Sequence, residues 1–267
     1  MITEGEIAEA VAALDTAEKS RVQTGLLSLK YPGMALDDAY LVQGEWVRRK
    51  LAAGRTSIGW KIGLTSKAMQ DALKIDTPDS GVLFDDMLFE NGTTIPADRF
   101  IQPRIEAEIA FVMKAPLQGP GVSVFDVLSA TDYVTPALEI LDTRILRADP
   151  ETGKTRTVVD TISDNAANAG IVLGGRAMRV DQVDLRWMGA IVSRNAVVEE
   201  TGLGGGVLND PAVGIAWLAN RLGSYGGRIE AGQVVLAGSF IRPIEAGHGS
   251  TIMGDYGPYG TVGCYFA

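Results

Sequence analysis

The sequence predicts an α+β protein with a helical N-terminal region followed by a longer region rich in strands. Residues 6–17 and 36–53 carry apolar side chains at helical spacing. After residue 56, predicted strands outnumber predicted helices and do not alternate with them regularly, which argues against a doubly wound sheet or a TIM barrel. We therefore expect a helical region at 1–55 and a mixed β core at 56–267, and the two can form one domain.

Capping and turn residues set the limits of these elements. The second N-terminal helix follows a turn at 31–33, begins near Asp37 or Asp38 and ends at Gly54. A later helix is predicted at 211–222, with Asp210 as its N-cap, Pro211 at its first position and Gly223 at its end. The other elements predicted in the core are a strand at 56–64, a short helix at 66–73, a hairpin at 81–95 closed at Asn91-Gly92, a short helix at 124–129, a polar loop at 147–157, and strands at 170–173, 185–193, 196–201, 233–237 and 260–266.

Composition narrows the classes of function. The 267 residues carry a net charge of −9, which argues against electrostatic binding of nucleic acid. The single cysteine, Cys264, excludes an intrachain disulfide and fits a reducing compartment, and its apolar surroundings favour packing over a nucleophilic role. The N-terminus lacks a basic and then apolar leader, and no segment is long and apolar enough to span a bilayer. We expect a cytoplasmic protein with no membrane or nucleic-acid partner.

The single histidine and the glycine run argue against two common kinds of site, a multi-histidine metal site and a phosphate-binding loop. His248 is the only histidine, so no site with several histidine ligands can form within one chain, and acid–base work falls to Glu, Asp, Lys, Tyr or bound water. A lone histidine in a Gly-rich stretch is typical of a surface loop. The glycine run at 202–206 lacks the Gly-Lys-Ser/Thr ending of a phosphate-binding loop and is typical of a turn.

Three carboxylates, Glu106, Glu108 and Glu139, lie inside apolar segments rather than in charged loops. Residues 105–111 alternate, so a strand would place Glu106 and Glu108 side by side on one face. Buried carboxylates that share a pocket repel one another unless a cation lies between them, and ligands that are all oxygen suit Mg²⁺ or Mn²⁺. The alternative is the solvent face of an ordinary antiparallel strand. The spacing alone does not decide whether Glu139 joins the other two.

Lys61 and Asp79 are candidates for proton transfer. Lys61 lies in an apolar strand, where burial would lower its pKa and nearby carboxylates would raise it. The alternative for Lys61 is an edge strand from which the ammonium reaches solvent. Asp79 lies in the turn-like stretch 77–81, where capping of the local backbone is the competing interpretation.

Two further segments carry possible binding groups. Ser163, Asp164 and Asn165 form a polar cluster before an apolar strand, and they either line a pocket or cap the next element. Gly238 and Ser239 end the strand at 233–237. Their backbone amides either meet a carboxylate or form only a bend between strand and loop.

Six blocks, which together cover nearly the whole chain, resemble the hydratases of the fumarylacetoacetate hydrolase superfamily. They are Lys61-Ile62-Gly63-Leu64-Thr65-Ser66-Lys67-Ala68-Met69-Gln70, Pro103-Arg104-Ile105-Glu106-Ala107-Glu108, Ala130-Thr131-Asp132-Tyr133-Val134, Pro136-Ala137-Leu138-Glu139, residues 160–170, and Ala237-Gly238-Ser239-Phe240. The resemblance implies a helical N-terminal part packed on a mixed, barrel-like β core. It also implies a homo-oligomer built from dimers, for which a decamer is one expected size.

The same resemblance implies the chemistry. The family's metal ligands correspond to Glu106, Glu108 and Glu139 of this sequence. The family's site lysine corresponds to Lys61 and its pocket acid to Asp79. The implied activity is Mg²⁺-dependent addition of water to a 2-hydroxy-2,4-diene-1,7-dioate, giving 4-hydroxy-2-oxoheptane-1,7-dioate in the breakdown of aromatic compounds. Mn²⁺ is a possible substitute for Mg²⁺.

Three points stay open at this stage. A decarboxylase of the same superfamily acting on 2-oxo-3-hexenedioate (4-oxalocrotonate) and a non-catalytic carboxylate-binding subunit are the alternative functions. A C–C hydrolase is less favoured, because hydrolase relatives typically use a His–Glu pair and His248 lies in the wrong region for that role. The acid and base roles of Lys61 and Asp79 are not assigned. The distal carboxylate of a dioate should need a cationic partner, and Arg104 and Arg144 are candidates by sequence position.

Overall fold

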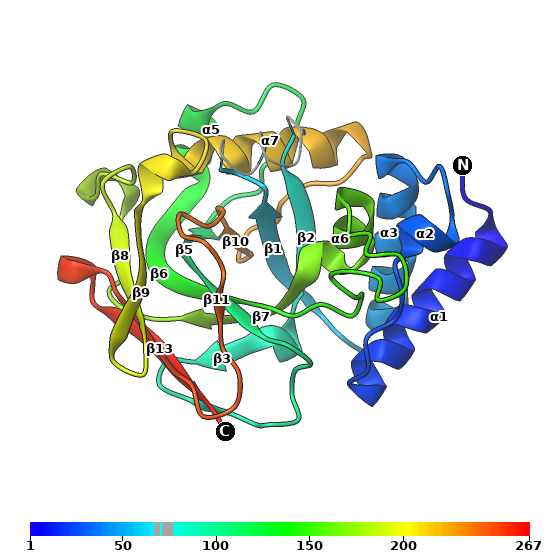
Figure 1. The fold of residues 1–267 in the computed structure, drawn as a ribbon. Helices are drawn as coiled ribbons and strands as arrows, with labels where there is room; N and C mark the ends of the chain where they lie inside the picture. Colours follow the sequence, from blue (N-terminus) through cyan, green and yellow to red (C-terminus); the bar gives the residue numbers. More distant parts are fainter. Residues whose placement is uncertain (67–69, 71–76) are drawn as a thin grey trace.

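The computed structural model describes residues 1–66, residue 70 and residues 77–267. Two β-sheets form the centre of the molecule and the N-terminal helices lie at one side of it, as Figure 1 shows. Most of the helix predicted at 66–73 lies outside the described residues. The prediction of an α+β protein with a mixed, curled β core is confirmed.

The N-terminal helices are α1 (Glu4–Ser20), α2 (Leu27–Lys30) and α3 (Leu36–Ala52). Thr3 and Glu6 form a capping box at the start of α1, which satisfies backbone N–H groups that have no partner within the helix. Apolar residues of α1 and α3, including Leu14 and Trp46, pack with Phe84 and Ile145 of the β region. The helices therefore share a core with the sheet, and the boundary at residue 55 stays a prediction.

The larger sheet has eight strands in the order β2-β1-β10-β5-β6-β7-β3, with β11 also paired to β5. The parallel pairs β1–β10 and β3–β7 make the sheet mixed. Its strands are β1 (Ser57–Gly63), β2 (Asp79–Phe84), β3 (Leu88–Glu90), β5 (Arg104–Met113), β6 (Thr131–Leu141), β7 (Asn168–Leu173), β10 (Val234–Leu236) and β11 (Ile244–Glu245).

The smaller sheet has five strands in the order β4-β13-β12-β8-β9. They are β4 (Thr94–Ile95), β8 (Gly189–Arg194), β9 (Val197–Leu203), β12 (Thr251–Asp255) and β13 (Thr261–Phe266). The remaining α-helices are α5 (Val124–Ala130), α6 (Val158–Ser163) and α7 (Pro211–Ser224). None of the described helices is long and apolar enough to cross a membrane.

The predicted hairpin at 81–95 is wrong. β3 pairs in parallel with β7 in the larger sheet, whereas β4 pairs in parallel with β13 in the smaller one. Asn91 donates its side-chain amide to the carbonyl of Thr261 and accepts from the N–H of Gly263. The Asn91-Gly92 turn therefore links two sheets, and partners distant in sequence decide where the flanking strands pair.

Smaller differences also come from tertiary contacts. The strand predicted at 185–193 begins only at Gly189, because residues 184–188 form a turn, and α7 continues one residue past Gly223. The strands β11 and β12 carry no strong alternation and were not predicted. Cys264 is buried in β13, as expected for a packing residue, and His248 is exposed after β11.

The two faces of the larger sheet differ. The apolar residues that alternate with the glutamates on β5, Ile105, Ala107 and Ile109, belong to the main hydrophobic core. Strand register places a smaller apolar cluster on the opposite face, where Ala110, Ala137 and Ile171 lie beside the glutamates. This inner face of the curled sheet holds the candidate site.

Candidate functional site

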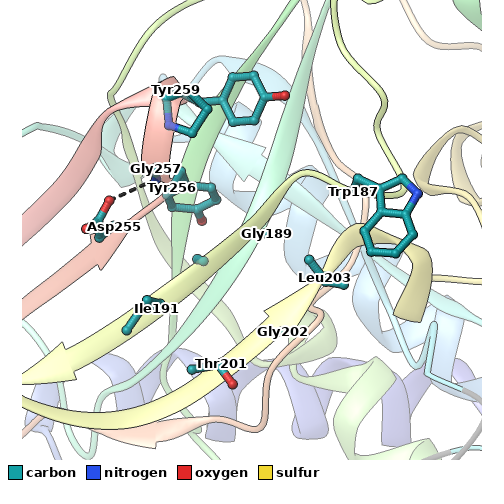
Figure 2. A pocket seen from close by; sticks show the side chains of 12 residues that line it. Trp187, Gly189, Ile191, Thr201, Gly202, Leu203, Asp255, Tyr256, Gly257 and Tyr259 are labelled. Atoms are coloured by element: carbon teal, nitrogen blue, oxygen red, sulfur yellow. Dashed lines mark hydrogen bonds between the residues drawn. The ribbon is translucent and has the colours of Figure 1, made fainter.

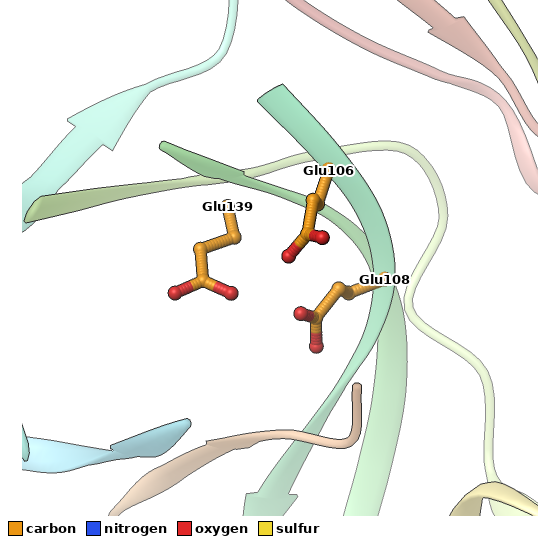
Figure 3. A group of neighbouring side chains, drawn as sticks. All are labelled: Glu106, Glu108 and Glu139. Atoms are coloured by element: carbon orange, nitrogen blue, oxygen red, sulfur yellow. The ribbon is translucent and has the colours of Figure 1, made fainter. Parts of the chain in front are cut away.

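Neighbouring strands bring the three glutamates together. Glu106 and Glu108 lie on β5, and Glu106 lies directly opposite Glu139 on β6. One carboxylate oxygen from each residue lies within 4.8 Å of the others (Figure 3). Glu108 and Glu139 are 0% exposed, so the alternative of a solvent-facing strand is wrong. The predicted convergence of Glu139 on the other two is present.

This cluster is poorly satisfied by the chain itself. Both oxygens of Glu139 and Oε1 of Glu108 are buried and have no hydrogen-bond partner among the described residues. Burial, and after it the charge of Glu139, raise the pKa of Glu106 to about 8, although Lys61 opposes the shift. Burial and the neighbouring glutamates raise the pKa of Glu108 as well. Unpartnered oxygens with mutual repulsion fit a hard divalent cation between the three carboxylates.

Lys61 reaches the edge of this cluster. Its Nζ lies 3.4 Å from Oε1 of Glu139, and the side chain is only 4% exposed. β1 lies between β2 and β10, so the edge-strand alternative is wrong. Burial alone would lower the pKa of Lys61, but the charges of Glu139, Asp79 and the other two glutamates outweigh it and raise the pKa. The ammonium therefore stays charged.

Asp79 lies beside Lys61 rather than in a solvated turn. It is the first residue of β2 and lies opposite Gly63 of β1. A Cβ on Gly63 would collide with Oδ1 of Asp79 and lie 3.0 Å from Nζ of Lys61, so both polar groups converge over this glycine. Oδ1 of Asp79 is buried without a hydrogen-bond partner among the described residues. Burial raises the pKa of Asp79, and the charge of Lys61 opposes the shift.

A second group of residues holds the glutamates in place. The N–H of Gly238 donates to Oε2 of Glu108 at 2.7 Å. The backbone amide therefore binds a carboxylate, as one of the two interpretations of Gly238 expected, but this carboxylate is a side chain of the protein. Gly238 has φ +115, and a Cβ there would collide with Thr65, so only glycine fits. The hydroxyl of Ser239 instead donates to the carbonyl of Ile241 at 2.9 Å.

Tyr256 was not found from the sequence. It follows β12 in the smaller sheet, yet its hydroxyl accepts from the N–H of Glu108 at 3.1 Å and lies 2.6 Å from the carbonyl oxygen of Ala137. It fixes β5 and β6 at the point where the glutamates project. No local pattern around residue 256 signals this, because the contact spans more than a hundred residues.

The polar cluster at 163–165 serves mainly as scaffold. Ser163 donates to the carbonyl of Val159 at 2.8 Å, and the side chain of Asn165 bonds both the N–H and the carbonyl of Val82. A Cβ on Gly81 would collide with the carbonyl oxygen of Asn165, and Gly81 lies opposite Lys61. The segment therefore borders the site through its backbone.

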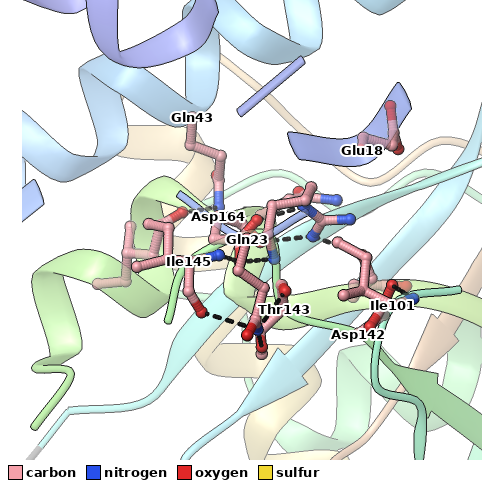
Figure 4. Close-up of polar contacts among 12 residues, drawn as sticks. Glu18, Gln23, Gln43, Ile101, Asp142, Thr143, Ile145 and Asp164 are labelled. Carbon is pink, nitrogen blue, oxygen red and sulfur yellow. Dashed lines mark hydrogen bonds and ion pairs between the residues drawn. The ribbon is translucent and has the colours of Figure 1, made fainter. Parts of the chain in front are cut away.

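The two predicted arginines already have carboxylate partners in the chain. Arg144 is 2% exposed and pairs with Asp164, and its Nη2 also donates to the carbonyls of Asp164 and Asn168 (Figure 4). Arg104 donates to Oε1 of Glu245 at 2.8 Å. Neither is the free cation that a distal carboxylate would require.

Three other buried polar groups were not found from the sequence. The hydroxyl of Tyr40, both amide atoms of Asn168 and Nη1 of Arg156 are buried and have no hydrogen-bond partner among the described residues. Burial raises the pKa of Tyr40, and the charge of Asp79 adds to this shift. Tyr40 lies on α3 and Arg156 in the loop before α6, so their burial depends on how these helices pack.

A surface hollow elsewhere is not the site. Figure 2 shows it on the smaller sheet, where Trp187, Ile191 and Leu203 lie around it. None of the three clustered glutamates lines it, nor does Lys61 or Asp79. Three of its apolar side chains are largely exposed, with 72% of Trp187, 49% of Ile191 and 46% of Leu203 accessible.

Known proteins place the chain in a family, although no protein-family model matches it. It is 57% identical over 253 residues to the 2-oxo-hept-4-ene-1,7-dioate hydratase of Escherichia coli, covering 95% of each chain. It is 37% identical over 236 residues to a 4-oxalocrotonate decarboxylase of Pseudomonas putida, covering 88% of this chain and 87% of the relative.

A solved structure has nearly the same fold over the whole chain. The 4-oxalocrotonate decarboxylase from Pseudomonas putida G7, complexed with magnesium and adipate, superposes with a TM-score of 0.93 at 34% identity. The match covers 100% of this chain and 99% of the other. The metal complex of that protein agrees with the glutamate cluster of this one as a divalent-metal site. The chain belongs to the fumarylacetoacetate hydrolase superfamily, and within it to the hydratases, enzymes of the hydro-lyase kind.

Proposed function

We propose that the chain is a Mg²⁺-dependent hydratase that converts 2-hydroxyhepta-2,4-diene-1,7-dioate into 4-hydroxy-2-oxoheptane-1,7-dioate in the breakdown of aromatic compounds. The observation that carries this proposal is the buried cluster of three glutamates with Lys61 and Asp79 at its edge. The 57% identity to a hydratase of the corresponding 2-oxo-heptene-dioate supports the substrate class.

Glu106, Glu108 and Glu139 are the proposed ligands of Mg²⁺, and their oxygens suit Mn²⁺ equally. When bound, the cation would act as a Lewis acid toward the 2-oxygen of the substrate, where negative charge develops. The glutamates are oriented for this by Gly238 and Tyr256, which fix Glu108 through its side chain and its backbone.

The overall reaction balances as a tautomerisation followed by conjugate addition. In the first step the 2-hydroxyl loses its proton and C5 gains one, which leaves a C2 ketone conjugated to a C3–C4 double bond. In the second step the hydroxyl of water bonds to C4 and a proton bonds to C3. The protein must therefore move protons at four atoms, the 2-oxygen, C5, the oxygen of the water and C3, without any change in redox state.

Lys61 and Asp79 are the proposed groups that move these protons. Against the effect of burial, the charges of four carboxylates raise the pKa of Lys61, so its ammonium suits a partner for the anionic substrate. A cation bound to the glutamates would offset those charges and lower this pKa, which would suit Lys61 to proton transfer. The pKa of Asp79 is raised by burial, so this carboxyl suits exchange of a proton with water. Their convergence over Gly63, at the edge of the glutamate cluster, supports a shared role in these proton transfers.

The test separates hydratase from decarboxylase. The 2-hydroxy-diene-dioate, generated enzymatically, is supplied with Mg²⁺, and the dienol absorbance, product mass and CO₂ are followed together. A mass gain of one water without CO₂ is expected. The second candidate, a 4-oxalocrotonate decarboxylase, is favoured by the solved structure of that enzyme and predicts stoichiometric CO₂ from its own substrate. A non-catalytic subunit predicts metal binding with no turnover of either compound.

We also propose a homo-oligomer built from dimers. Exposed apolar side chains on the smaller sheet, among them Trp187 and Ile191, support an interface on that face. Sedimentation equilibrium of the purified protein should give a mass well above 28.3 kDa. A monomer at micromolar concentration would contradict this part of the proposal.

A further inference from the structure

Arg156 is a partly buried arginine that forms no ion pair with any residue in the described ranges 1–66, 70 and 77–267. It directly precedes Thr157, the N-cap of α6, and its backbone N–H donates to the carbonyl of Arg147 at 2.8 Å. Its Nη1 is buried, and no described residue accepts a hydrogen bond from it. A guanidinium presents five N–H groups in a fixed fork, so a buried, unused donor is a costly feature unless a ligand supplies the acceptor.

The arginines around it differ in this respect. Arg104 and Arg147 both donate to Oε1 of Glu245, and Arg144 pairs with Asp164. Within the described part of the chain, no carboxylate lies within ion-pair distance of Arg156. The three paired arginines therefore have structural roles. The charges of Asp164 and Asp160 act on Arg156, but no described residue accepts a hydrogen bond from its Nη1, so this donor is available to a ligand.

The position of Arg156 relates it to the reacting groups. α6 packs against α3 and β2, and the backbone that follows it covers Gly81, opposite Lys61. In Figure 1 this segment lies between the larger sheet and the N-terminal helices. The charge of Arg156 also lowers the pKa of Asp79 against the larger effect of burial. Arg156 and Asp79 therefore belong to one electrostatic environment.

We propose that Arg156 is a specificity-determining residue that binds the distal carboxylate of a dioate substrate. This inference rests on the proposed function, which fixes the other end of the substrate at the glutamate cluster and Lys61. Two parallel N–H···O bonds from the guanidinium would then satisfy the buried Nη1 and neutralise the second carboxylate. A monocarboxylic dienoate would leave that donor unpaired and would therefore bind more weakly. Arg156 would in this way favour the dioate over the monocarboxylate.

Ligand binding tests the proposal without any turnover. In the presence of Mg²⁺, calorimetry compares adipate, a six-carbon dicarboxylate, with hexanoate, the monocarboxylate of the same length. Arg156→Gln should weaken adipate binding about 10- to 100-fold, the range for a lost charge-assisted hydrogen bond, and leave hexanoate unchanged. Arg179→Gln is the matched control, because Arg179 is 72% exposed and pairs only with its neighbour Asp181 in the described chain. Equal losses for both ligands, or no loss for adipate, would overturn the proposal.

Kinetics separate this inference from the proposed function. The ratio of kcat/KM for the seven-carbon dioate to that for 2-hydroxyhexa-2,4-dienoate should fall about 10- to 100-fold in Arg156→Gln. Arg156→Lys keeps the charge and should restore part of the ratio, and it serves as the second variant if the glutamine variant does not fold. If the unaltered protein hydrates neither compound, the proposed function fails, and the adipate and hexanoate affinities still decide the role of Arg156.

Discussion

Two buried charged clusters lie on the same fold and are built in opposite ways. Around Arg144, the carboxylate of Asp164 accepts from the guanidinium and from the N–H groups of Arg144 and Ile145. In the glutamate cluster, neither oxygen of Glu139 has a hydrogen-bond partner among the described residues. The Arg144 cluster consists of Arg144 and Asp164, and its guanidinium lies over the ring of Trp46 in α3 at 5.4 Å. Figure 4 shows Asp164 near Gln43 of the same helix, whereas Figure 3 shows the glutamate cluster on the strands of the larger sheet.

The difference indicates what each cluster is for. A buried charge whose hydrogen bonds are complete acts as a rigid joint, because removing either partner leaves the other unsolvated. A buried charge with free lone pairs and repelling neighbours is incomplete without a ligand. The first cluster should therefore govern stability and the second should govern binding and turnover.

The largest expected effect is on stability. Arg144→Met should reduce the free energy of unfolding by about 3–5 kcal/mol, because Asp164 loses its buried cation. Denaturant unfolding of the metal-free protein measures this. The exposed control Arg179→Met should unfold at the same denaturant concentration as the parent protein. A loss as small in Arg144→Met as in the control would show that the Arg144 cluster is not a structural joint.

The next effect is on metal binding and turnover. Glu139→Gln should lower kcat by about 10²- to 10³-fold, or ~3–4 kcal/mol in the barrier, because one ligand charge is lost. Its metal-free stability should fall by less than that of Arg144→Met, since repulsion among the glutamates is relieved. Mg²⁺ calorimetry and unfolding are measured on both variants, with Glu90→Gln, an exposed residue of the same sheet, as control. Unchanged Mg²⁺ affinity in Glu139→Gln would remove Glu139 from the ligand set.

Lys61 tests whether the edge of the glutamate cluster is catalytic. Lys61→Met should fold and should lower kcat about 10²-fold, or ~2.7 kcal/mol, the lower range for loss of a proton-transfer group. Stopped-flow loss of dienol absorbance at saturating substrate gives kcat. Lys114→Met, which removes an exposed lysine after β5, should keep full activity. Normal kcat in Lys61→Met, or failure of that variant to fold, would mean that Lys61 is a structural counter-ion.

The smallest expected effect is stabilisation by metal. Mg²⁺ at ten times its dissociation constant should add about 1.4 kcal/mol to the free energy of unfolding, because the ion binds only the folded cluster. Chelation should reverse the gain, which thermal unfolding measures as a lower Tm. The gain should vanish in Glu139→Gln and persist in Lys61→Met. An equal gain in all three proteins would place the stabilising ion elsewhere.

Local patterns in the sequence predicted much of the scaffold. The apolar stripes predicted α1 and α3, the Asp210-Pro211 pair predicted the start of α7, and alternation at 105–111 predicted that Glu106 and Glu108 share a face. These features depend on neighbours within a few residues, which is why they can be read from the chain directly. The hairpin at 81–95 failed because its strands pair with segments far away in sequence.

In the candidate site, too, some features could be predicted from local sequence and others depended on tertiary contacts. Residue types and spacing alone singled out the carboxylates and Lys61, since charged groups inside apolar segments are locally unusual. The register of β5 and β6 decided that Glu139 joins the cluster, and the pairing of β1 with β2 decided that Asp79 meets Lys61. Tertiary packing alone gave Arg144 a partner and left Nη1 of Arg156 without one among the residues that the structure describes. The physical reason is that a side chain's charge and size belong to the sequence, whereas its burial and its partners exist only once distant segments are packed together.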